Sequence, residues 1–208
     1  MRMYLLACVL GLAITPAAAT LAVADHADLY GGVSVGIAAA AMPNGDYKDL
    51  RCVAPKGKTV AGFADWRACD AGPDGVRMLH AEINEPGEDD SLVAGHPVNL
   101  MLGFNGDGRL ARIVIDTKSK GPMYLRKKAF LLGMQAKARY GDSGWTCQDL
   151  PLDAGEEALG PTSVNQHCTK TAGNRRITVV RSLFRKVGAQ QKDFTSASHI
   201  VIDWAGAK

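Results

Sequence analysis

The clearest pattern in the chain is an alternation of apolar residues within residues 97–141. Apolar side chains occupy every second position over 98–104, and a second apolar segment over 110–115 returns along the chain. A period of two is typical of a β-strand with one buried face. Residues 105–108 (Asn-Gly-Asp-Gly) tolerate positive φ, so they suit the turn between two strands. This segment therefore predicts a β-hairpin.

The period changes to about 3.6 after Gly121-Pro122, which is the spacing of one face of an α-helix. The apolar stripe consists of Leu125, Ala129, Leu132, Ala136 and Tyr140. Gly141 follows at the position where a left-handed helix C-cap is expected. We therefore expect an α+β fold, in which one main amphipathic helix packs on an antiparallel sheet.

Weaker patterns complete the expected order of elements. A short helix is expected over 37–42, and strands over 76–83, 177–180 and 199–204. Residues 144–173 read as irregular. The halves 25–118 and 119–208 thus share a coarse order of helical stretch, cysteine-bracketed segment and strands. This order allows two tandem pseudo-repeats, within one domain or two, although no residue-level identity supports a duplication.

The N-terminal 24 residues have the features of a signal peptide. A short basic start at 1–3 precedes an apolar run over 4–14, and Ala22-Val23-Ala24 has the form that a signal peptidase cleaves. Cleavage there leaves 25–208 as the exported chain. The apolar run is shorter than the ~20 residues that a membrane-spanning helix needs, so no transmembrane segment is expected after cleavage.

Two alternatives remain open at this end of the chain. Cleavage after Ala19 would also follow small residues. The sequence Leu5-Leu6-Ala7-Cys8 resembles a bacterial lipoprotein cleavage box, which would place a lipid on Cys8. However, few residues precede this cysteine and the apolar run continues after it.

The four remaining cysteines indicate two disulfides. An even number of cysteines in an exported chain favours disulfides, and three connectivities are open to Cys52, Cys69, Cys147 and Cys168. Loop closure favours the sequence-local pairs, Cys52 with Cys69 and Cys147 with Cys168. A zinc site is the alternative, but zinc ligands usually include a close pair such as C-x-x-C, which is absent. We expect neither a metal nor a cofactor.

Charge is distributed unevenly along the chain. Residues 25–106 contain 6 Lys/Arg and 12 Asp/Glu, whereas residues 107–208 contain 17 and 9. The candidate basic face comprises Arg126, Lys127, Lys128, Arg181, Arg185 and Lys186. Such a face favours an anionic partner, either an acidic protein surface or an anionic envelope polymer. Few aromatic residues accompany the charge, so nucleic acid is not an expected partner.

Two segments carry a resemblance to a known group of exported bacterial domains. The run 106–113 (Gly-Asp-Gly-Arg-Leu-Ala-Arg-Ile), followed by a helix that ends at Tyr140-Gly141, is similar to β-lactamase-inhibitor-protein-like and BamE-like domains. The resemblance covers about a quarter of the chain. Export, a helix packed on antiparallel strands and one cysteine pair in each half add to the resemblance. It implies a binding or scaffold role without catalysis. No functional residue can be carried over from it.

One motif suggests an enzyme instead. The sequence Gly-Asp-Ser-Gly around Ser143 is similar to the nucleophile motif of chymotrypsin-like proteases, and His80 with Asp89 or Asp90 would supply the other triad groups in chain order. Trp145 stands where that family has glycine, and a helix directly precedes the motif. A helix C-cap and turn explain the motif more simply.

The sequence as a whole predicts an exported, non-enzymatic protein-binding module, periplasmic or secreted, of the inhibitor, immunity or envelope-assembly type. Its expected partner is another envelope or secreted protein. A secreted serine hydrolase that uses Ser143 is the alternative.

Overall fold

The computed structural model describes residues 27–29, 32–87, 91–119, 122–159, 163–190 and 192–206. The expected signal peptide and Cys8 lie outside these residues, as do Asp89 and Asp90.

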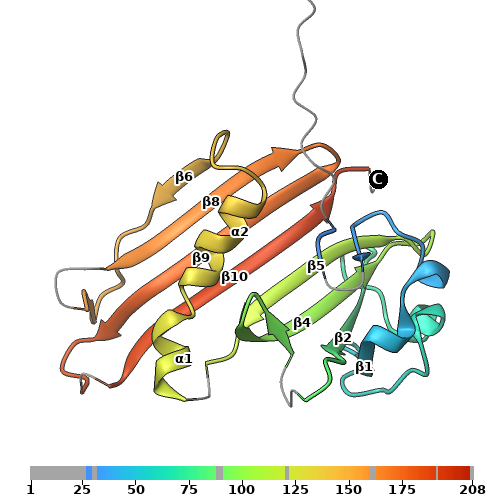
Figure 1. Ribbon diagram of the computed structural model, residues 1–208, viewed down its shortest axis with the longest axis horizontal. Coiled ribbons are helices and arrows are strands. Elements are labelled where there is room, and N and C mark those ends of the chain that lie inside the picture. Colours follow the sequence, from blue (N-terminus) through green and yellow to red (C-terminus); the bar gives the residue numbers. More distant parts are fainter. Residues whose placement is uncertain are drawn as a thin grey trace, which may run out of the picture.

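One large antiparallel sheet of ten strands makes up most of the fold. The strands are β1 (Tyr47–Cys52), β2 (Arg77–Ile83), β3 (Leu92–Val93), β4 (His96–Phe104), β5 (Leu110–Thr117), β6 (Thr146–Asp149), β7 (Glu156–Glu157), β8 (Val164–Ala172), β9 (Arg175–Lys186) and β10 (Phe194–Trp204). Their spatial order is β1-β2-β4-β5-β10-β9-β8-β6, with β3 paired to β4 and β7 paired to β9. The last strand therefore lies in the middle of the sheet, beside β5 (Figure 1).

The helices within the described residues are short. They are the 3₁₀ helices η2 (Ala39–Ala41), η3 (Asn44–Asp46) and η4 (Phe63–Ala68) and the α-helices α1 (Met123–Lys128) and α2 (Leu131–Arg139). In Figure 1, α1 and α2 lie over one face of the sheet. The α2 helix contacts β9 and β10, and α1 contacts β10 and β4. The helix expected over 37–42 is only the three-residue η2.

The prediction of an α+β fold with one main helix is wrong, because the chain is mostly antiparallel sheet. Three of the five residues of the predicted helical stripe, Ala129, Leu132 and Tyr140, are buried, and Leu125 and Ala136 are partly buried. The helix nevertheless breaks near Ala129, where serines of β10 replace its backbone hydrogen bonds. The Ser198 hydroxyl accepts from the Gly133 N–H and donates to the Ala129 carbonyl, each at 2.9 Å.

The segment 144–173, expected to be irregular, supplies β6, β7 and β8. The two halves proposed from the sequence contribute to one continuous sheet through the β5–β10 pairing. The division at residue 118 stays a prediction.

The central hairpin is confirmed as β4 and β5, which pair in antiparallel register. In its turn, the Asn105 side chain accepts from the backbone N–H groups of Asp107 and Arg109. Gly108 has a φ of +76°, and a Cβ atom there would lie 3.1 Å from the Trp66 ring. Glycine is needed here both for the turn conformation and for the close approach of Trp66.

The core lies between the sheet and the segments that cover one of its faces, which we call the covered face. Two cross-strand rows dominate it, Leu102-Ile113-Ile202-Ile177 and Leu100-Ile115-Ile200-Val179, all at most 3% exposed. The α2 helix packs over β9 and β10, while η4 packs over β1 and β2. Burial of these apolar side chains is the main force that holds both halves to one sheet.

Both disulfide pairings favoured by loop closure are confirmed, Cys52–Cys69 and Cys147–Cys168. Two disulfides fit an oxidising, extracellular-type environment. Within the described residues, no helix is long and apolar enough to cross a membrane.

Candidate interaction surface

The second face of the sheet, which we call the open face, carries the side chains that alternate with the core. On β5 and β10 these are Arg112, Val114, Asp116, His199, Val201 and Asp203. The α1 and α2 helices pack on the opposite, covered face. There the Ser198 hydroxyl of β10 accepts a hydrogen bond from α2, and Leu132 of α2 is buried. Eight paired strands spaced at about 4.8 Å make the sheet on the order of 35–40 Å wide. That width exceeds what a standard protein–protein interface requires.

An apolar row crosses the middle of the open face. Met101, Val114 and Val201 are direct cross-strand neighbours on β4, β5 and β10. Val114 is 7% exposed, while Met101 and Val201 are partly exposed. His80 on β2 pairs with Met101 and extends the row, and burial lowers the pKa of this histidine. Met101 and Val201 therefore present apolar surface that no element of the described residues covers, with the buried Val114 between them.

A charged row lies on one side of the apolar row. The Arg112 guanidinium donates to the Asp203 carboxylate at 2.7 Å and to the Asp74 carboxylate at 2.6 Å. Arg176 on β9 lies opposite Asp203 on β10 in the strand register, and its side chain is exposed. The backbone N–H of Val76 is the main group that lowers the pKa of Asp74, and Arg112 adds to the effect. Arg112 is thus neutralised by two carboxylates, whereas Arg176 makes no ion pair with any residue that the structure describes.

These charged residues surround a hollow of about 670 Å³ at this end of the open face. Its walls include Asp74, Arg112, Thr171, Arg176, Asp203 and Trp204. A hollow of this size is within the range of ligand sites. With Arg176 on its wall, it suits a carboxylate brought by a partner.

The other side of the apolar row carries Asp116 and His199, which are paired across β5 and β10. The His199 Nδ1 atom lies 2.5 Å from the Asp116 carboxylate. This hydrogen bond raises the pKa of His199. An apolar centre flanked by polar groups is the usual anatomy of a protein–protein interface.

The basic residues proposed from the sequence do not form one face. Arg126, Lys127 and Lys128 lie on α1, and Arg181 and Arg185 lie on the covered side of β9. Arg181 donates to Gln166 at 2.7 Å, and Arg185 pairs with Glu157 at 2.7 Å. Lys186 follows Arg185 along the strand and therefore points to the opposite side.

Lys127 of this set borders a second groove, which lies beside α1. The groove has a volume of about 680 Å³ and is lined by Met123, Lys127, Leu159, Leu183, Gln190, Lys192 and Phe194. The Arg126 guanidinium lies 5.2 Å from the Phe194 ring. Arg126 and Lys127 are therefore close together beside a groove on the covered side, and neither lies on the open face.

Ser143 lies in the turn that follows α2, as the C-cap interpretation requires, and Gly141 has a φ of +85°. The Lys170 ammonium holds this turn, because it donates to the carbonyls of Tyr140, Gly141 and Ser143. Among the described residues, no hydrogen bond joins Ser143 to a histidine. His80, the histidine proposed for a triad, lies on the open face in β2.

No family model, curated protein or solved structure matches this chain. The sequence reasoning missed the open face, although β5 and β10 carry a signal for it. Their outward positions read Arg-Val-Asp at 112, 114 and 116 and His-Val-Asp at 199, 201 and 203. A valine between charged residues on two strands indicates an apolar row with polar borders once the strands are known to pair.

Proposed function

We propose that this protein is an exported, non-enzymatic binding module, periplasmic or secreted, that binds another envelope or secreted protein through the open face of its sheet. The partner places apolar side chains over Met101, Val114 and Val201. It also places a carboxylate beside Arg176. The observation that carries the proposal is the apolar row, which no element of the described residues covers and which charged groups border.

The chemistry of the border supports an acidic partner. Arg112 and His199 already face carboxylates of their own chain. Arg176 is exposed at the hollow, so a partner carboxylate would find a cation there without displacing an existing pair. Charge pairs at the border of an interface mainly set the association rate and the choice of partner.

The experiment compares two charge reversals of equal size on opposite sides of the sheet. Partners are captured from an envelope extract with the mature protein, and the purified partner is then titrated against variants. Arg176→Glu should weaken binding about tenfold or more, because it places a negative charge opposite the partner's carboxylate. Val201→Thr, which is nearly isosteric, should weaken binding severalfold through lost apolar contact.

Lys127→Glu is the matched control, since it makes the same charge change on α1. Binding should stay within about twofold of wild type, with a similar melting temperature for all three variants. If Lys127→Glu weakens binding and Arg176→Glu does not, the partner binds at the α1 groove and the proposal for the open face is wrong. An activity lost in Ser143→Ala would instead support a hydrolase.

A further inference from the structure

The two disulfides differ sharply in their surroundings. Cys52 and Cys69 are 2% and 1% exposed, within the core cluster that contains Phe63 and Trp66. Cys147, in contrast, is exposed and belongs to β6, the outermost strand on its side of the sheet, whose four residues are all exposed. Cys147 is therefore the one half-cystine of the two bonds that is exposed to solvent, and we expect an external thiol to reach its sulfur while the core stays folded.

The partner sulfur of that bond is inaccessible. Cys168 is fully buried and lies directly opposite Cys147 in the pairing of β6 with β8. The side-chain oxygen of Gln166 lies 3.3 Å from its sulfur and also accepts a hydrogen bond from Arg181. An incoming thiolate can therefore attack only at Cys147, and Cys168 must be the leaving group.

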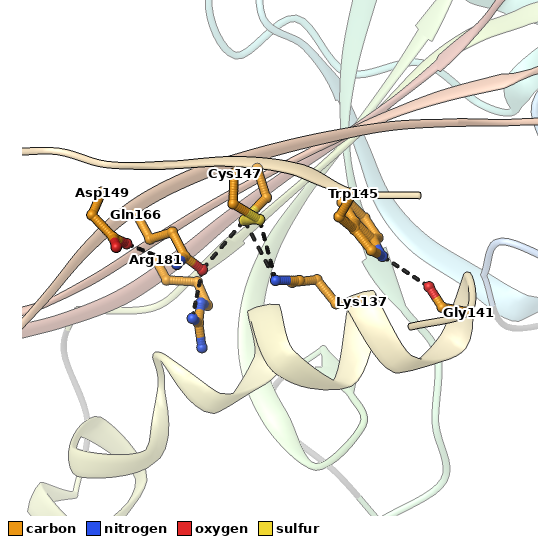
Figure 2. Close-up of a disulfide and its surroundings, with 8 residues drawn as sticks. Lys137, Gly141, Trp145, Cys147, Asp149, Gln166 and Arg181 are labelled. Atoms are coloured by element: carbon orange, nitrogen blue, oxygen red, sulfur yellow. Dashed lines mark hydrogen bonds between the residues drawn. A yellow bond between two sulfur atoms is a disulfide. The ribbon is translucent and has the colours of Figure 1, made fainter. Parts of the chain in front are cut away.

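A lysine is placed to stabilise that leaving group. The Lys137 ammonium lies 3.3 Å from the Cys147 sulfur and 3.5 Å from the Cys168 sulfur, and Figure 2 shows it pointing from α2 to the disulfide. Trp145 holds this position, because its ring lies 5.8 Å from the ammonium and its indole N–H is fixed by the Gly141 carbonyl at 2.9 Å. A neighbouring cation lowers the pKa of a thiol and makes its thiolate a better leaving group.

We propose that Cys147–Cys168 is a site of thiol–disulfide exchange whose co-substrate is a dithiol. A thiolate of the dithiol attacks the Cys147 sulfur, and a mixed disulfide forms as the Cys147–Cys168 bond breaks. The bonding electron pair leaves on the Cys168 sulfur as a thiolate beside the Lys137 ammonium. The second thiol of the reductant loses its proton and attacks the reductant's own sulfur in the mixed disulfide, which releases Cys147. Two electrons and two protons pass to the protein, and the dithiol becomes a disulfide.

The test uses dithiothreitol on the folded mature protein at neutral pH without denaturant. Free thiols are blocked with N-ethylmaleimide at timed intervals, and the labelled cysteines are identified by peptide mass spectrometry. Label should enter Cys147 and Cys168 while Cys52–Cys69 stays oxidised. Lys137→Gln should slow the reduction at least about threefold, because a change of one pKa unit in the leaving thiol changes the rate by roughly that factor.

Two further variants separate the charge from the fold. Lys137→Arg keeps a cation and should retain most of the wild-type rate. Lys127→Gln removes a cation from α1, away from the disulfide, and should leave the rate unchanged. Cys52–Cys69 reports folding in every sample, since it opens only if the core opens. Equal reduction of both disulfides in the wild-type protein, or a Lys137→Gln rate equal to that of wild type, would overturn the proposal.

Discussion

The two faces of the sheet are built from the same strands but have opposite chemistry. On the covered face, neighbouring positions of β5 and β10 hold isoleucines that are almost completely buried, such as Ile113 and Ile202. One residue away, Arg112 and Asp203 point to the open face and form a partly exposed ion pair. Alternation along a strand thus separates a face that stabilises the fold from a face that is available for recognition.

The comparison also holds for charged groups. On the covered side, Asp28 is completely shielded and bonds Arg175, the Tyr140 hydroxyl and the Val35 N–H, at 2.8, 2.8 and 2.9 Å. Burial of the Tyr140 hydroxyl and the negative charge of the neighbouring Asp28 carboxylate together raise the pKa of Tyr140. The side chains of Arg112 and Asp203 are instead about one-third exposed. Removing one partner of a charge pair shielded from water leaves an uncompensated buried charge and strongly destabilises the fold. A pair in contact with water contributes little to the free energy of unfolding.

The largest effect expected from this contrast is at Asp28. Asp28→Ala removes the acceptor shared by Val35, Tyr140 and Arg175, and should reduce the free energy of unfolding by about 3–5 kcal/mol. Asp203→Ala is the matched change on the open face and should cost at most about 1 kcal/mol. Urea denaturation of both variants measures the difference. Equal losses would mean that the two faces do not differ in the energetic role of their charges.

The next effect concerns the apolar side of the covered face. Leu132 is 2% exposed and borders a cavity of about 210 Å³ beneath α2, with Ile115 and Ile200 among its other walls. Leu132→Ala should cost about 2–5 kcal/mol, because it removes buried methyl groups and enlarges an existing cavity.

Lys127→Ala provides the comparison for that variant, since Lys127 is exposed on α1. Its free energy of unfolding should stay within about 0.5 kcal/mol of wild type. Similar losses for Leu132→Ala and Lys127→Ala in chemical denaturation would show that the buried face of these helices has been assigned wrongly.

The elements predicted correctly are those whose apolar residues follow a clear period. The central hairpin and the buried helical stripe are of this kind, because the buried positions within 98–104, 110–115 and the helices are apolar. The β8 strand was missed because two of its covered-face positions hold Gln166 and Lys170. These polar groups are satisfied by Arg181 and by the carbonyls of the turn after α2, contacts that depend on tertiary structure. The helix break was missed for the same reason, since it depends on Ser198 of a strand 69 residues from Ala129.

The candidate surface was beyond prediction for a related reason. Met101, Val114 and Val201 form one row only because β5 pairs with β10, which follows it by more than 70 residues. Alternation shows that each valine points away from the core, but it does not show which strands are neighbours. The disulfides were predictable because short sequence separation favours their pairing.

The smallest effect expected is a pH dependence on the open face. The hydrogen bond that His199 donates to the Asp116 carboxylate raises the pKa of His199, so the folded state binds a proton more tightly than the unfolded state does. The resulting stabilisation is fully present below the unfolded pKa of about 6.5 and disappears as pH rises through the higher folded value. The His199 side chain is 46% exposed, so this contribution is small.

His199→Gln should therefore lower the urea midpoint relative to wild type at about pH 5.5 and match it in alkaline buffer. His80 and His96, whose pKa values are lowered, act with the opposite sign but are common to both proteins. A difference between wild type and variant that increases with pH would show that Asp116 does not stabilise the protonated imidazole.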